Sequence, residues 1–450
     1  MKTCAIAGLL SVASAIPALA DGPVLDLSGQ IDLGFRFYTE DGQYSGQGPA
    51  GYYPFIGMQL NGGMSVGPGE LVFQFDGLGD DANDRSTFNI QKAYYTQSFD
   101  NWDLVVGYNV EDWGVSNGRT IVNVLNARDA SNQVGGSELI GTPMLNANFF
   151  TGIGTFSAYV LGGDVSSNYG GQATRQRGPF PTYGDFATYQ QDDELDVALR
   201  YSNYFSVGSG SLDFGLSYYQ GTNREAVLLP GCVTTSGPVT PAICDQMSTA
   251  LRDAYEAGTL TPTSVSEIAA LLVSQFGIAV ASEGPNVLAQ VPYYQDIQQV
   301  GLTAVYAQGD TQFRFEGYVR ETDNERFTAG IIGGDHTFYD FAGTDGTLIL
   351  ALEYHFDDRS VMQPATIFND DAFLGLYYSL NDPNDSRVEF GLFQDLESSA
   401  QLYSLSLSRR IGDRMRAQIS ASHVETGSQF DPLTVLDGDT FFEFTLSTFF

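Results

Sequence analysis

The chain lacks long apolar segments and has few basic residues. Beyond residue 20, no stretch reaches eighteen consecutive apolar residues, whereas a membrane-spanning helix needs about 20. Helical membrane spans are therefore excluded. The 20 Lys and Arg are outnumbered by 54 Asp and Glu, which gives a net charge of −34. Because phosphates attract basic rather than acidic surfaces, we expect no nucleic-acid partner. The acidity is consistent with a preference for cations in a pore, and equally with solubility in salty surroundings.

Cysteine and histidine are also scarce, with three of each in the chain. One cysteine lies within the first twenty residues, which leaves Cys232 and Cys244. In an oxidising compartment this pair predicts a local disulfide, and a metal site is the weaker alternative because no histidine is near. His336, His355 and His423 belong to no recognisable nucleophile motif. We therefore expect no enzyme activity, no metal and no cofactor, with a hydrolase as the weaker alternative.

The first twenty residues have the pattern of a cleaved export signal. Lys2 precedes an apolar stretch at residues 5–16, and Ala18-Leu19-Ala20 supplies small residues before a cleavage point. The apolar stretch is too short to span a membrane as a helix. We expect a signal peptide at residues 1–20 and one mature domain at residues 21–450.

The composition of the mature chain favours strands. The sequence has 25 Tyr, 31 Phe and 51 Gly, and only 16% of its residues are charged, a bias towards β-structure and tight turns. Segments of about ten residues alternate between apolar and polar side chains. In the first of them Leu25, Leu27 and Leu33 fall on one face, and Asp32 and Arg36 on the other. The predicted fold class is all-β, an antiparallel transmembrane β-barrel of 16 to 18 strands with long extracellular loops.

Connection lengths separate a membrane barrel from a soluble sandwich or propeller, because only the barrel needs short turns and long loops to alternate. Short turns are expected near residues 62–69, 99–101, 152–154, 206–211, 308–311, 341–346, 381–385 and 411–413. This arrangement gives eighteen strands and leaves both chain ends at the periplasmic side. The weakest strand lies at residues 327–338, because it contains Gly333 and Gly334. Lys92 shares a face with Phe88 and Ile90, so either a bulge resets that strand or the lysine extends towards the membrane surface.

The polar face of each strand is expected to line a lumen. Charges of both signs there would orient dipolar solutes and bias ion selectivity, and the alternative is that they pair with each other along a water-filled wall. The predicted pore-lining residues of the strands are Asp32, Arg36, Arg200, Arg314, Glu316 and Arg320.

Residues 107–141 contain an unusual combination of Trp, Asn, Arg and Asp. Trp113 and Gly114 precede the sequence Asn126-Ala127-Arg128-Asp129. This stretch resembles the strand-to-loop passage of a large group of proteobacterial outer-membrane barrels, many of unknown function, in which proline commonly stands where this chain has Ala127. Residues 408–413 resemble a late turn of the same group. The terminal aromatic Phe450 resembles the insertion signal of Gram-negative outer-membrane barrels. Together these features suggest a porin-like protein.

A loop rich in amides and guanidinium groups is suited to folding inward, where it can bind both the wall and a passing solute. We therefore expect residues 107–141 to form a constriction, with Arg119 and Arg128 facing anions and Asp112 and Asp129 opposing them. The alternative is a structural latch in which Arg128 pairs with a carboxylate and Trp113 packs beneath the loop. The predicted constriction residues are Asp112, Trp113, Asn117, Arg119, Asn126, Arg128 and Asp129.

The longest loop is expected at residues 221–291. Ser264 and Glu267 form a capping box that predicts a helix ending at Gly277, with a companion helix near residues 247–257. The loop could pack these helices together or cover the pore mouth. The sequence as a whole predicts an outer-membrane channel for small polar solutes or ions, in contact with lipid and lipopolysaccharide, as a monomer or a homotrimer. A plugged barrel with a structural or adhesive role is the main alternative.

Overall fold

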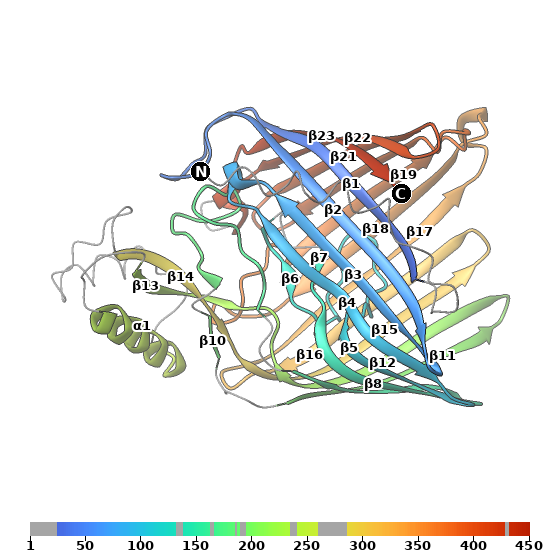
Figure 1. Ribbon diagram of the computed structural model, residues 1–450, viewed down its shortest axis with the longest axis horizontal. Helices are drawn as coiled ribbons and strands as arrows, with labels where there is room; N and C mark the ends of the chain where they lie inside the picture. Colours follow the sequence, from blue (N-terminus) through green and yellow to red (C-terminus); the bar gives the residue numbers. More distant parts are fainter. Residues whose placement is uncertain are drawn as a thin grey trace.

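The computed structural model describes residues 25–131, 138–162, 166–184, 187–189, 195–234, 241–259, 286–427 and 432–450. These residues form an 18-stranded antiparallel sheet in which each strand pairs with the next along the chain. Pairing between the first and last strands closes the sheet into a barrel, shown in Figure 1. The strands are β1 (Leu25–Tyr38), β2 (Gly51–Val66), β3 (Gly69–Gly79), β4 (Thr87–Ser98), β5 (Trp102–Asn109), β8 (Thr142–Thr151), β9 (Gly154–Leu161), β11 (Asp196–Val207), β12 (Gly210–Thr222), β15 (Asp296–Gln308), β16 (Thr311–Glu321), β17 (Arg326–Phe338), β18 (Thr347–Asp357), β19 (Asp370–Ser379), β20 (Arg387–Asp395), β21 (Gln401–Ile411), β22 (Met415–Glu425) and β23 (Thr440–Phe449).

The predicted all-β barrel is confirmed, with a strand count at the upper end of the expected range. The short turns fall where the sequence predicts them, and the weakest predicted strand is β17. Its Gly333 is required by a close approach, since a Cβ atom there would lie 2.4 Å from the carbonyl oxygen of Leu352 and 2.6 Å from Cγ of Glu353. The glycine that weakens the sequence pattern therefore makes room for a side chain of the neighbouring strand.

The outer surface of the barrel is apolar and its inner surface is polar. Leu33, Leu199 and Phe313 are 55%, 58% and 57% exposed, whereas Arg36 and Glu316 on the other face are 3% and 0% exposed. A closed sheet leaves no unpaired strand edge, so it can present such side chains to lipid. An even number of strands, with short turns at the rim where β1 begins and β23 ends, is typical of outer-membrane barrels. The chain is therefore a transmembrane barrel of the Gram-negative outer membrane.

The position of Lys92 is explained by a bulge. The pairing of β3 with β4 shifts between Gln74 and Phe75, so that Lys92 lies opposite Gln74 and Ile90 lies opposite Phe75. Gln91 is the extra residue, and the shift returns Lys92 to the face that carries Gln74. Of the two interpretations of this lysine, the bulge is confirmed.

The extracellular loops carry their own structure, and part of it projects beyond the barrel rim in Figure 1. A three-stranded sheet consists of β10 (Thr188–Tyr189), β13 (Val227–Thr234) and β14 (Asn286–Tyr294). The helix α1 (Pro241–Glu256) packs on it through Tyr255, which is buried in one cluster with Val227, Leu229 and Tyr293. The sequence pattern predicts this helix but not the antiparallel pairing of β13 with β14. No helix in the described ranges is long and apolar enough to cross a membrane.

Three predictions lie outside the described residues. The signal peptide at residues 1–20 and the capping-box helix at residues 264–276 are not described. Cys232 lies in β13 and Cys244 in α1, but their side chains are also outside the described part. The disulfide between them stays a prediction.

Candidate functional site

The loop between β5 and β8 folds into the barrel and is tethered to the wall by a glutamate of β16. The backbone N–H groups of Val115 and Ser116 donate to Oε2 of Glu316 at 2.6 and 3.1 Å, and Ile121 N–H donates to Oε1 at 2.5 Å. The carboxylate is fully buried. Charged acceptors form the stronger class of hydrogen bonds, so this side chain is one of the contacts that fix the position of the loop.

A second tether comes from β18. Glu353 accepts hydrogen bonds from the N–H groups of Asn117 and Gly118 at 2.5 and 3.0 Å. Arg314 of β16 donates through Nη1 to the carbonyl of Val115 at 2.7 Å and through Nε to Asp335 of β17 at the same distance. Five strands separate β5 from β16 around the barrel. The loop therefore crosses the lumen, and its short strands β6 (Arg128–Asp129) and β7 (Glu138–Leu139) appear within the barrel outline in Figure 1.

The base of the loop packs on the wall formed by β8, β9, β11, β12 and β15. Trp113 is 3% exposed and lies edge-on to Tyr159, with ring centroids 5.6 Å apart. The guanidinium of Arg200 lies 5.2 Å from the centroid of the Trp113 ring. Val122 and Leu125 of the loop are completely buried in the same cluster. The loop thus fills one side of the lumen with an apolar core of its own.

Two further predicted constriction residues hold the loop together. Asn126 is 2% exposed, and its Nδ2 donates to the carbonyls of Asn109 and Ile140 at 2.9 Å each. Asp129 is also 2% exposed and accepts from Nδ2 of Asn89 at 2.9 Å. Because they are buried, Trp113, Asn126 and Asp129 do not face a passing solute. The packing of Trp113 beneath the loop is the position that the structural latch predicts for it.

A cavity of about 620 Å³ remains between the loop and the opposite wall. The predicted constriction residues Asp112, Asn117, Arg119 and Arg128 all line it. Strands β19 to β23, the β18–β19 loop and β1 supply the facing side. Its lining residues include Arg36, Phe368, Phe373, Tyr377, Glu389, Phe393, Ser404, Ser406, Ser420, Ser422 and Phe441. The open side of the lumen is therefore lined by hydroxyl groups, aromatic rings and a few charges.

Most of the predicted wall charges do not line this cavity, and their role in a pore stays a prediction. Glu316 is covered by the loop, and Arg320 is 1% exposed because both its Nε and Nη2 bind Oε1 of Gln299. Arg314 binds the loop, and Arg200 lies against Trp113. Asp32 accepts from Gln30 at 2.7 and 2.9 Å and is not among the lining residues. Of the six predicted wall residues, Arg36 alone lines the cavity.

A group of arginines surrounds one carboxylate beside the loop. Glu225 lies 3.1 Å from Arg320, 3.3 Å from Arg359 and 3.5 Å from Arg119. Burial alone would raise the pKa of Glu225, but Arg359, Arg320 and Arg119 together hold it well below its usual range. The pKa of Arg119 is lowered to about 10, first by burial and then by the neighbouring arginines against the opposing effect of Glu225. Glu225 therefore stays charged and connects the loop to β16 and the β18–β19 loop.

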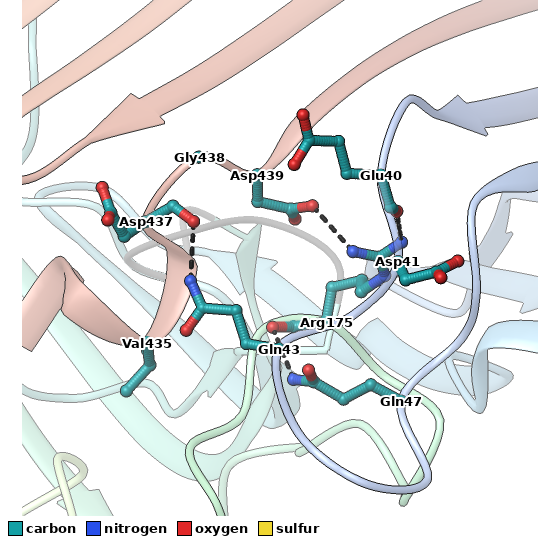
Figure 2. Close-up of a pocket in the computed structure, with 9 residues that line it drawn as sticks. All are labelled: Glu40, Asp41, Gln43, Gln47, Arg175, Val435, Asp437, Gly438 and Asp439. Carbon is teal, nitrogen blue, oxygen red and sulfur yellow. Dashed lines mark hydrogen bonds and ion pairs between the residues drawn. The ribbon is translucent and has the colours of Figure 1, made fainter.

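The extracellular mouth is narrowed by residues 166–184. Arg175 binds Asp439 at 3.0 Å and the carbonyl of Glu40, while Gln47 donates to the carbonyl of Arg175 at 3.2 Å. Figure 2 shows how these contacts join this segment to the β1–β2 loop and the β22–β23 loop. A small hollow lies among them, lined by the carboxylates of Glu40, Asp41, Asp437 and Asp439. Gln176 of the same segment reaches the large cavity below.

Sequence reasoning missed Glu225 and the phenylalanines of the cavity. Alternation places Glu353 on the lumen face beside His355, but it does not indicate that Glu353 binds the loop. Glu225 follows a strand without any local motif, and its partners are remote in sequence.

Phe373 shares a strand face with Asp371, and Phe393 shares one with Glu389. The alternation of β19 and β20 therefore places both rings on the inward face, and only their apolar character excluded them from the predicted lining residues.

Comparison with known proteins finds similarity in structure alone. No family model matches the chain, and no curated protein is similar to it. The outer membrane channel DcaP of Acinetobacter baumannii is similar over 95% of this chain and 98% of its own, with 9% identity and a TM-score of 0.44. A mutant porin of Rhodopseudomonas blastica has 10% identity over 95% and 100% of the two chains, with a TM-score of 0.42. OmpT, a Vibrio cholerae outer membrane protein in trimer form, has 8% identity over 96% and 100%, with a TM-score of 0.39.

Proposed function

We propose that this barrel is a channel for the diffusion of small hydrophilic solutes or ions across the outer membrane. The observation that carries the proposal is the cavity of about 620 Å³ between the inward loop and strands β19 to β23. Tethers to Glu316 and Glu353 hold the loop across the lumen, so it narrows the barrel without depending on a ligand. A fixed, partly polar passage of this kind suits passive transport.

Within the proposed channel, the constriction is formed by four of the residues that the sequence indicates. Asp112, Asn117, Arg119 and Arg128 lie on the loop side of the cavity. Trp113 and Asn126 support them from below through the buried contacts described above. The loop would therefore act both as a constriction and as a latch, because some of its residues line the passage and others hold the loop in place.

Ion preference depends on the charges that face the passage rather than on the charge of the whole chain. The charged side chains in the cavity lining are three arginines (36, 119 and 128) and two carboxylates, Asp112 and Glu389. Arg36 is paired with Glu443 at 2.7 Å, so it adds no net charge to the passage, and the cation preference expected from the net charge of −34 stays a prediction. Reversal potentials across a salt gradient test this preference.

A plugged barrel with a structural or adhesive role is the second candidate. It is favoured by the contacts of Arg175, which close part of the extracellular mouth. A hydrolase has less support: His355 pairs with Glu353 at 3.1 Å, and His336 and His423 bind threonine hydroxyls at 2.7 Å. Within the part of the chain that the structure describes, none of these hydrogen-bond partners is a serine or a cysteine.

Planar-bilayer recording of the purified chain tests the proposal. Stepwise conductance with simple salts, and permeation of small sugars in liposome swelling, are the expected results. A folded, inserted protein that conducts nothing would refute the channel and favour the plugged barrel. The partners proposed with this function are outer-membrane lipid, lipopolysaccharide and the solute itself. Crosslinking in detergent distinguishes the proposed monomer from the homotrimer.

A further inference from the structure

Arg119 makes fewer hydrogen bonds and ion pairs than the neighbouring arginines Arg320 and Arg359. Arg320 binds Gln299 and Glu225, and Arg359 binds Asp357 through Nε at 2.9 Å as well as Glu225. By contrast, the guanidinium of Arg119 has a single ion pair of 3.5 Å among the described residues, and its buried Nε has no hydrogen-bond partner. A guanidinium has five N–H donors, so Arg119 retains unused capacity at the cavity wall.

The charge around Arg119 is also unbalanced. Three arginines, Arg119, Arg320 and Arg359, share two carboxylates, Glu225 and Asp357. Among the ion pairs of the described residues, the arginines of this group outnumber its carboxylates by one, although the chain as a whole has a net charge of −34. Arg119 is the member of the group that lines the cavity. A local excess of positive charge in a partly water-excluded site favours an anion there.

Aromatic rings lie directly beside this cation. The Arg119 guanidinium carbon lies 4.6 Å from the centroid of the Phe368 ring. Phe393 lies 4.7 Å from Phe368 and 4.6 Å from Phe373, measured between ring centroids. All three rings line the cavity, and a Cβ atom on Gly118 would lie 2.9 Å from both Phe373 and Phe393. The tip of the loop therefore rests against an aromatic cluster with the arginine at its edge.

We propose that the cavity selects solutes that carry a carboxylate on a flat apolar ring, with Arg119 binding the carboxylate. The inference rests on the proposed channel function and names its solute class. The planar fork of a guanidinium matches the two oxygens of a carboxylate. A flat ring stacks on phenylalanine at centroid distances of about 4.5 to 7 Å. The same rings contribute nothing to a fully hydrophilic solute, since they have no hydrogen-bonding groups.

Benzoate, benzamide and propionate separate the two parts of the proposal in single-channel recordings. Benzamide has the ring without the charge, and propionate has the charge without the ring. We expect benzoate to interrupt the current at lower concentrations than either analogue. Arg119→Gln should weaken the block by benzoate at least about tenfold, because a hydrogen-bonded charge pair is lost, and should leave benzamide unchanged. Phe393→Leu should reduce the preference for benzoate over propionate.

Two further variants control the experiment. Arg119→Lys keeps the charge but loses the planar fork, so benzoate should block this variant with a constant between those of the unmodified chain and Arg119→Gln. This variant replaces Arg119→Gln in the experiment if Arg119→Gln fails to fold. Arg387→Gln removes a positive charge at the periplasmic turn, where the side chain is 51% exposed, and should behave as the unmodified chain. Folding of each variant is checked by its heat-dependent gel mobility.

The possible failures are distinguishable. Equal block by benzoate and benzamide, or benzoate block that survives Arg119→Gln, overturns the carboxylate site while the channel stands. If the barrel does not conduct, calorimetric titration of the full chain with benzoate decides: Arg119-dependent binding retains the site and rejects the channel. Absence of both conductance and binding rejects both.

Discussion

Replacing Glu316 with alanine should release the inward loop from the wall of the barrel. The buried carboxylate accepts three N–H groups, from Val115, Ser116 and Ile121. Hydrogen bonds to a charged group contribute about 1.5 to 3 kcal/mol each, so the tether stabilises the inward position by roughly 4 to 9 kcal/mol. A loss of only about 3 kcal/mol shifts the equilibrium between inward and released loop by roughly two orders of magnitude. Glu353 retains its own two bonds, so partial release is expected.

Single-channel recording measures this effect directly. Glu316→Ala should conduct more than the unmodified chain and show greater current noise, because the loop no longer holds one position. Glu321 provides a matched control, since it ends the same strand and is exposed, and Glu321→Ala should leave both quantities unchanged. A folded Glu316→Ala barrel with unaltered conductance and noise would show that the carboxylate does not position the loop.

Four other perturbations give separate tests. Arg128→Ala should change single-channel conductance or ion preference, and an unchanged channel would confine this cavity-lining residue to a structural role. Trp113→Ala should lower resistance to thermal unfolding, since loss of a buried tryptophan costs about 3 to 5 kcal/mol; an unaltered midpoint on heating contradicts its packing role. Because the arginines depress the pKa of Glu225, its charge contributes stability above its ordinary pKa, and this contribution is lost only as the pH falls below that range. The stability difference between the unmodified chain and Glu225→Gln should therefore stay constant from neutral pH to about 5 and narrow in stronger acid, and a difference that already narrows at pH 6 contradicts the depressed value. Cys232 and Cys244 should resist alkylation until the protein is reduced, and labelling without reductant rejects the disulfide.

The strand predictions succeeded because they depend on local alternation. Leu33 and Arg36 take opposite faces in sequence and in structure, and the parity of the connections located β17 despite its paired glycines. The functional residues were harder to predict, because residues of a loop do not alternate between two faces as those of a strand do. Asp112 and Arg119 line the cavity as expected, whereas Asp129 has the same type of side chain as Asp112 and is buried. No local pattern separates those two aspartates.

The amino-acid sequence by itself determines the class of barrel, the range of its strand number and which face of each strand meets lipid, because a strand exposes alternate side chains to two different solvents. Only the tertiary structure decides which polar residues face the passage. That choice depends on contacts between residues about two hundred positions apart, such as those of Val115 with Glu316 and of Asn117 with Glu353. These contacts arise when the sheet closes and brings distant strands within reach of one loop.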